Sequence, residues 1–278
     1  MTEQQTDWLL FQQNLGPNWI NEDIEYWRSA EDQAEVFRLN FIEERKEKEA
    51  NAAWYVTKLC KARRLFLKCW QNIGAGEYKQ SWDDFETIEH ICLSLLKNDF
   101  YPQIKKGVEQ FLRQVHVWQK LYPYKVFTSP EFHIKKRECT ICKSVRSPWT
   151  DCGHKTGHVY MGEMCSDLVT DVAIVGLSLV TDPVQKYSVM EPYSHTLSNS
   201  DQEKRFKAVN FTYNLLPSPF TPFDIKETTK LTPHSDFPNI AEIDVCPCES
   251  GRAYGKCCQN NDGVRQPHLI VLPAAIKT

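Results

Sequence analysis

Eight of the eleven cysteines lie in two short groups whose spacing could bind metal ions. One group falls between residues 139 and 165, and the other falls between residues 246 and 258. Zinc takes four soft ligands at tetrahedral corners, and tight turns supply such ligands in pairs. We therefore expect two Zn²⁺ sites. The other cysteines stand alone in apolar helical patterns, where we expect small buried hydrophobic side chains: Cys60, Cys69 and Cys92.

The C-terminal group reads CPCESGRAYGKCC. Cys246 and Cys248 flank a proline whose fixed φ orients both thiolates toward one point. A Ser-Gly turn then brings Cys257 and Cys258 back to the same ion. So short a segment has almost no hydrophobic core, so the metal bonds must supply its folding free energy. These four cysteines predict a closed, structural zinc site in a C-terminal module.

This stretch resembles the SEC-C zinc motif, which is named for the C-terminus of the bacterial SecA translocase motor and is appended to many bacterial proteins. The resemblance is limited to residues 246–258 and their flanks. It implies the same four ligands, with Cys258 at a closing position that is Cys or His in the family. Glu249 departs from the glycine common there. In SecA the motif contacts a chaperone and the ribosome, so the resemblance implies a protein or ribosomal partner and a bacterial protein.

The middle group reads CTICKSVRSPWTDCGHKTGHVYMGEMC. Cys139 and Cys142 form a C-x₂-C pair, and Cys152 and His154 form a second short pair. Two such pairs closing one loop make a compact zinc knuckle, so we favour these four ligands. Cys165 in place of His154 is the alternative, and the sequence leaves the fourth ligand open. His158 is a further candidate. We assign this knuckle to no known family.

Neither group has the pattern of a catalytic metal site. Catalytic zinc keeps an open position for water and usually has His or carboxylate ligands, whereas thiolate-rich sites are closed. The sequence also lacks the H-E-x-x-H, G-x-S-x-G, Walker and G-x-G-x-x-G motifs. We therefore assign no catalytic residue and interpret the chain as more consistent with a non-enzymatic protein. An enzyme whose site is assembled from distant residues stays open.

The elements that must position these groups predict an α+β fold in four parts. Residues 1–123 show apolar residues at helical spacing and no proline or glycine from 21 to 73, which predicts a helical bundle. A capping box of Ser81 and Asp84 predicts one helix start, and another helix is expected over 103–121. We expect a β-containing knuckle domain over 124–195, a Pro-rich linker with limited secondary structure over 196–240, and the SEC-C module over 241–278.

The composition favours a cytoplasmic interaction protein. The formal net charge is −3, which gives no global attraction to nucleic acid. No apolar run could cross a membrane, and the first residues have no secretory pattern. We therefore expect an adaptor whose zinc modules bind a protein or ribosomal partner, without membrane insertion. The alternative is nucleic-acid binding by a basic knuckle with a stacking side chain, through Lys135, Lys136, Arg137, Lys143, Arg146 and Trp149.

Overall fold

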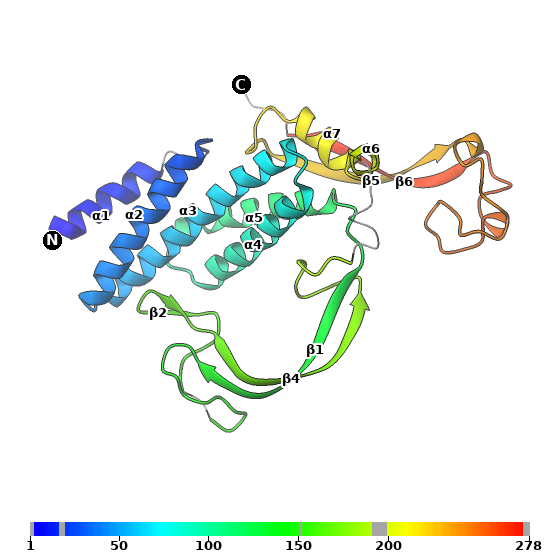
Figure 1. Ribbon diagram of the computed structural model, residues 1–278. Helices are drawn as coiled ribbons and strands as arrows, with labels where there is room; N and C mark the ends of the chain where they lie inside the picture. Colours follow the sequence, from blue (N-terminus) through cyan, green and yellow to red (C-terminus); the bar gives the residue numbers. More distant parts are fainter. Residues whose placement is uncertain (1–2, 17–19, 151, 191–198, 275–278) are drawn as a thin grey trace. The chain divides into compact units, whose positions relative to one another are not determined.

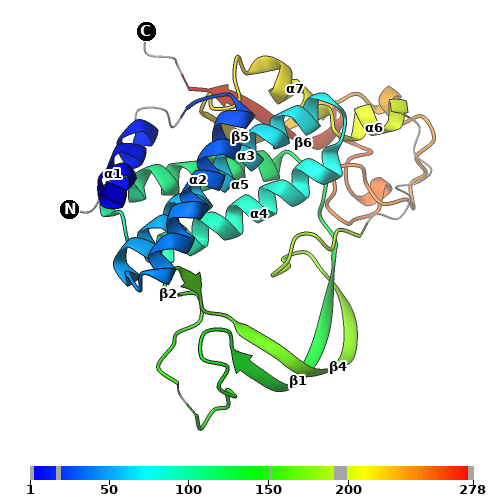
Figure 2. The ribbon, with the colours of Figure 1, turned by 60° about the vertical axis from the view of Figure 1, so that its left-hand side comes forward.

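The fold is α+β, as the sequence predicts, and contains a helical bundle and three two-stranded antiparallel sheets among the described residues (Figures 1 and 2). The computed structural model describes residues 3–16, 20–150, 152–190 and 199–274. The chain divides into two compact units, Met1–Phe220 and Thr221–Thr278. The expected domain boundaries at 123, 195 and 240 stay predictions.

The helical bundle is built around α3 (Glu47–Gly74), which packs against both α2 (Ile24–Glu43) and α4 (Tyr78–Lys97). It is completed by α1 (Glu3–Leu15) and by α5 (Lys105–Lys120), which follows a 3₁₀ turn at Pro102–Ile104. Arg45 adopts a positive φ of 56° and separates α2 from α3. The bundle and the helix expected over 103–121 are confirmed. The isolated cysteines Cys60, Cys69 and Cys92 are fully buried in it. Among the described helices, none is long and apolar enough to cross a membrane.

The predicted capping box is wrong. The helix begins at Tyr78, so Ser81 lies one turn inside it rather than at its start. Ser81 is buried, and its hydroxyl bonds to the carbonyl oxygen of Tyr78 and to the hydroxyl of Tyr122. The chain can restart a helix so early because Gly76, at a φ of 78°, reverses it within the short turn after α3.

A long two-stranded ribbon follows the bundle. It pairs β1 (Phe127–Cys139) with β4 (Asp167–Val180), and the short pair β2 (Val159–Tyr160) and β3 (Glu163–Met164) lies within the intervening segment. At its base, Phe127 pairs with Val189, and the indole of Trp82 in α4 donates a hydrogen bond to the carbonyl oxygen of Lys186. The ribbon thus extends from the bundle at one end and reaches the middle cysteine group at the other.

The expectation of limited secondary structure over 196–240 is wrong for the residues described there. Helices α6 (Asn199–Arg205) and α7 (Lys207–Leu215) belong to the first unit. Strand β5 (Phe223–Thr232) pairs along its whole length with β6 (Val264–Pro273) to form the second unit's ribbon. Prolines and Ser/Thr residues do not prevent a strand that has a partner, because pairing satisfies its backbone groups. Residues 196–198 lie outside the described residues.

Candidate metal centres

The C-terminal cysteine group lies between the paired ends of β5 and β6, where Thr232 opposes Val264. The sulfur atoms of the group lie within 4.8 Å of one another: Cys246, Cys248, Cys257 and Cys258. The backbone N–H of Cys246 donates to the carbonyl oxygen of Arg252 across a short bridge. This hairpin turns the Cys-Pro-Cys segment back toward the closing pair, so all four thiolates can reach one ion.

The turn between the two cysteine pairs orients the thiolates. Glu249 has a φ of 62° and Gly251 a φ of 73°, so the chain reverses through two left-handed residues. The Ser250 hydroxyl lies 3.1 Å from the Cys248 sulfur and 3.2 Å from the Cys257 sulfur. The hydrogen bond with Ser250 is the main cause that lowers the pKa of the Cys248 thiol to about 6. A lowered thiol pKa favours the thiolate, which is the form that binds zinc.

Little apolar packing supports this C-terminal loop. Its buried core consists of Tyr254, Val264 and two of the cysteines, with Phe237 and Ile240 partly buried against it. Tyr254 packs in this core with Cys246 and Cys258, and its hydroxyl bonds to Nδ1 of His234 at 2.6 Å. So small a core does not offset the entropy of ordering the loop, which fits a module stabilised by a bound ion.

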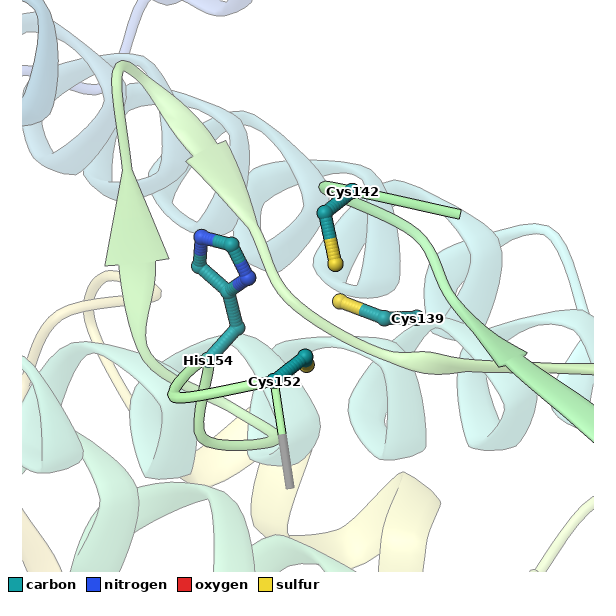
Figure 3. A group of neighbouring side chains, drawn as sticks. All are labelled: Cys139, Cys142, Cys152 and His154. Carbon is teal, nitrogen blue, oxygen red and sulfur yellow. The ribbon is translucent and has the colours of Figure 1, made fainter. Parts of the chain in front are cut away.

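The middle group brings together the four residues that the sequence favours (Figure 3). The ligand atoms of Cys139, Cys142, Cys152 and His154 lie within 4.8 Å of one another. Nδ1 of His154 is buried and has no hydrogen-bond partner, and the ring rests edge-on against Tyr160 at 4.7 Å. A buried imidazole nitrogen beside three sulfurs is the donor set that zinc accepts, so the residues fit the ion.

Cys165, the alternative ligand, lies beside this cluster. Its sulfur is 3.7 Å from that of Cys139, and it accepts a hydrogen bond of 3.0 Å from the Arg146 guanidinium. Burial raises the pKa of the Cys139 thiol, but Arg146 and nearby backbone N–H groups outweigh it and lower that pKa to about 5. Arg146 thus stabilises negative charge on the sulfurs. This geometry favours His154 as the fourth ligand and Cys165 as a neighbour, while the ligand set stays a prediction. His158 is not among the four grouped residues in the described chain.

Polar side chains of the bundle hold the loop that carries this cluster. Buried Asn98 donates to the carbonyl oxygen of Gly157 and accepts from the N–H of Val159. Asn51 accepts from the N–H of Gly162, whose carbonyl oxygen accepts from Arg38. These residues could not be predicted from the sequence pattern. Helical periodicity marks apolar positions, and nothing in the spacing of an asparagine indicates that it faces another segment.

The proposed nucleic-acid-binding residues lie around the same ribbon and loop, but acids lie close to most of their charges. Lys136 pairs with Glu138 at 2.8 Å, and both Arg137 and Arg146 pair with Asp167. Lys135 lies 3.8 Å from Asp171. Lys143 donates to the carbonyl oxygen of Thr140, and Trp149 is 92% exposed. These ion pairs reduce the positive potential that phosphates would meet, and nucleic-acid binding stays a prediction.

Both clusters have the chemistry of structural metal sites. Each brings together four candidate ligand residues, and four protein ligands would complete a tetrahedral zinc ion without a position for water. Bound zinc would therefore cross-link the loop and would not activate a substrate.

Comparison with known families identifies the C-terminal motif. The family model described as the SEC-C motif matches residues 244–260, the segment in which the four cysteine sulfurs meet. The chain therefore carries a SEC-C motif, which is a zinc-binding motif. No curated protein and no solved structure matches the chain significantly. The match covers a small part of the chain and defines a protein with a SEC-C motif and a second potential metal cluster.

Proposed function

We propose that this protein is a non-enzymatic, zinc-stabilised adaptor whose SEC-C unit binds a protein or ribosomal partner in the bacterial cytoplasm. The observation that supports this is an apolar surface beside the C-terminal cluster. Ile243 is 87% exposed and Val245 is 69% exposed, directly before the ligand Cys246. Two exposed branched apolar side chains beside a site that zinc would close favour a contact surface over a catalytic one.

The closed character of the site supports the same conclusion. A four-thiolate ion has no exchangeable position, so the module can act only through its surface. The flanking acids Glu242 and Asp244 are engaged within the module: Glu242 accepts from Gln259, and Asp244 accepts from the N–H of Ala241. These bonds fix the segment that presents Ile243 and Val245, which lowers the entropy lost on binding.

The test is binding of purified bacterial ribosomes by the full chain, measured by co-sedimentation. Because apolar side chains at the centre of an interface carry much of its free energy, Ile243→Asp combined with Val245→Asp should weaken binding at least about tenfold. The matched control is Asn260→Asp, which adds negative charge to an exposed position of the same module. Zinc content should stay unchanged in both variants.

A parallel capture from bacterial lysate covers a partner other than the ribosome. Wild type and the double variant are compared, with and without nuclease, and any protein that differs is purified and rebound. The proposal is contradicted if the chain does not bind ribosomes and no captured protein rebinds wild type more strongly than the double variant. Loss of the captured material on nuclease treatment would favour the basic-knuckle alternative. Point substitution is preferred to truncation after Ile240, because truncation would remove β6 and leave β5 unpaired.

A further inference from the structure

The β1–β4 ribbon has two chemically different faces. Residues paired across an antiparallel ribbon point to the same face, and the face alternates along each strand. Phe132 pairs with Ile174, and Ile134 pairs with Val172. The same face continues through the pairs Pro130 with Leu177 and Thr128 with Leu179. It is therefore apolar at nearly every position.

The opposite face is polar or small. Its pairs are Ser129 with Ser178, Glu131 with Gly176, and His133 with Ala173. The pairing shifts register between Glu131 and Phe132 and leaves Val175 outside the paired positions, but the two faces keep their character on both sides of this shift. A ribbon with one apolar and one polar face normally places the apolar face against a core and the polar face in water. The register thus defines which side of the ribbon should be covered.

The apolar face is instead open to solvent. Ile174 is 76% exposed, Leu177 is 68% exposed and Leu179 is 63% exposed, and Phe132 is half exposed. From Val172 to Val180 the strand contains no charged residue. Exposed strands normally carry charges that discourage association, so an uncharged apolar one is adapted to a partner surface or prone to aggregate.

We propose that this face, formed by Pro130, Phe132, Ile134, Val172, Ile174, Leu177 and Leu179, packs against the same face of a second copy of the chain. A copy brings an equally apolar surface of the same length, with no charge between Val172 and Val180 to bury or repel. Its ribbon has the same twist, and two such ribbons stack face to face as the sheets of a β-sandwich do. A two-fold arrangement also closes, so the exposed face would not propagate into fibres.

The dimensions of the face set the expected strength. About eight residues per strand at about 3.3 Å each give a length near 26 Å, and two strands spaced about 4.8 Å apart give a width near 10 Å. A footprint of this size is below the roughly 800 Å² per partner that stable complexes bury. The dimer should therefore be weak and should depend on concentration. This surface is separate from the SEC-C surface at Ile243 and Val245, so the two proposals can fail independently.

The experiment is sedimentation velocity on the full, zinc-loaded chain over roughly 1 to 100 µM, the range expected for a small interface. Wild type should shift from monomer to dimer. Ile174→Lys and Leu177→Lys, each placing a charge in the apolar face, should each raise the dissociation constant at least about tenfold. Ser178→Lys is the matched control, because it places the same charge on the opposite face of the same strand. It should change the dissociation constant less than about twofold.

Circular dichroism and zinc content of every variant show that the chain still folds. If a lysine variant loses its fold, Ile174→Ser removes the apolar side chain without adding charge and should weaken the dimer by a smaller factor. A wild type that stays monomeric at all concentrations overturns the proposal, even if the face binds another protein. Dimerisation that is insensitive to both lysines, or equally sensitive to Ser178→Lys, overturns it too.

Discussion

The two ribbons of this protein end in the same kind of cluster but differ in what holds that cluster. Strand β1 ends at Cys139, and β4 begins two residues after Cys165. Strands β5 and β6 also flank the SEC-C cluster, but at a greater distance along the chain: β5 ends at Thr232, before Cys246, and β6 begins at Val264, after Cys258. In each case a metal ion would close the loop between two antiparallel strands. The architecture is repeated, although the ligand sets and loops are unrelated in sequence.

The surroundings of the two loops are different. The middle loop is bound to the bundle through Asn98, Asn51 and Arg38, and Lys97 donates to the carbonyl oxygen of Thr156. The SEC-C loop, within its own unit, has a buried core of only four residues, two of them ligand cysteines. Cysteine spacing thus indicates that a metal binds, but it does not indicate how much of the structure depends on the metal. That dependence follows from the other contacts of the loop.

The largest effect that separates the two loops should come from metal removal. Structural zinc contributes about 10–16 kcal/mol of apparent binding free energy, far more than the small SEC-C core can replace. A chelator should therefore unfold residues 241–263 completely and leave the bundle folded. Elemental analysis should give about two zinc ions per chain before treatment, and NMR should then show which amide signals collapse.

The matched variants are Cys257→Ser with Cys258→Ser, which remove half of the SEC-C ligands. The double variant should bind one zinc ion fewer per chain, and only the SEC-C loop should unfold. Bundle unfolding in these variants would mean that the second unit is not independent. Equal loss of amide signals from residues 157–162 on chelation would show that the contacts with the bundle do not hold the middle loop, and the comparison would fail.

The next effect concerns the fourth ligand of the middle cluster. Loss of an outer-sphere partner typically lowers metal affinity about 10–100-fold, and loss of a ligand lowers it further. His154→Ala should therefore weaken cobalt binding at this cluster by more than about 100-fold. Cys165→Ser should weaken it less, because its sulfur is held by Arg146. Competition titration measures both, and the reverse order would make Cys165 the ligand.

How far the sequence predicted these features depends on how local they are. The cysteine groups could be predicted because their ligands lie within thirteen residues in one case and within sixteen in the favoured set of the other. The bundle could be predicted because helical periodicity repeats over many residues. The predictions that were wrong are those in which contacts between distant segments determine the structure. The residues next to Ser81 match a capping box, but in the structure the Ser81 hydroxyl forms a hydrogen bond with the hydroxyl of Tyr122.

The same reasoning explains the other omissions. The strand at 223–232 pairs with a strand that begins 32 residues after it ends, and no local sequence pattern indicates that pairing. Asn98 is recognisable as a docking residue only once the loop at 157–159 is beside it. Polar residues that bury against distant backbone groups carry no periodic signature, because their environment is set by tertiary structure.

A smaller effect should follow from Asn98→Ala. The side chain is buried and bonds to the buried Val159 N–H and the partly buried Gly157 carbonyl oxygen, so its removal takes this partner from both groups. We expect the first unit to lose about 2–4 kcal/mol of unfolding free energy and the middle cluster to release its metal faster. Urea unfolding and the rate of metal transfer to a chelator measure these effects.

Ser94→Ala, which removes only a side-chain bond within α4, is the control and should cost less than about 0.5 kcal/mol. If Asn98→Ala has no more effect than this control, the middle loop depends on its metal as strongly as the SEC-C loop does. The contrast between the two loops would then be lost.

The smallest effect is expected at the base of the β1–β4 ribbon, where Glu86 and Glu89 of α4 accept hydrogen bonds from Lys186. Burial raises the pKa of Glu89, but hydrogen bonds from His116, Lys186 and Gln119 outweigh it and lower that pKa to about 2. The pKa of Glu86 is raised, mainly by burial. Because the pKa of Glu89 is lower in the folded chain than in the unfolded chain, where it is near 4.3, the ionised carboxylate stabilises the fold at pH values above about 4.3. That stability is lost as pH falls through about 2.

Glu89→Gln should therefore flatten the decline in stability between about pH 4.5 and pH 2, by about 1–2 kcal/mol for a partly screened site. Thiol protonation should already have released the metal in this range, so tryptophan fluorescence would follow the bundle and ribbon base without it. Glu86→Gln is the matched control. Because the pKa of Glu86 is raised in the folded chain, this group stabilises the fold at pH values below its unfolded-state pKa, and that stability is lost as pH rises through its folded-state pKa. This variant should therefore not flatten the decline in stability at low pH. Equal flattening by both variants would remove Glu89 as the anchor, and the base of this ribbon would then depend on apolar contacts such as Trp82 with Phe127.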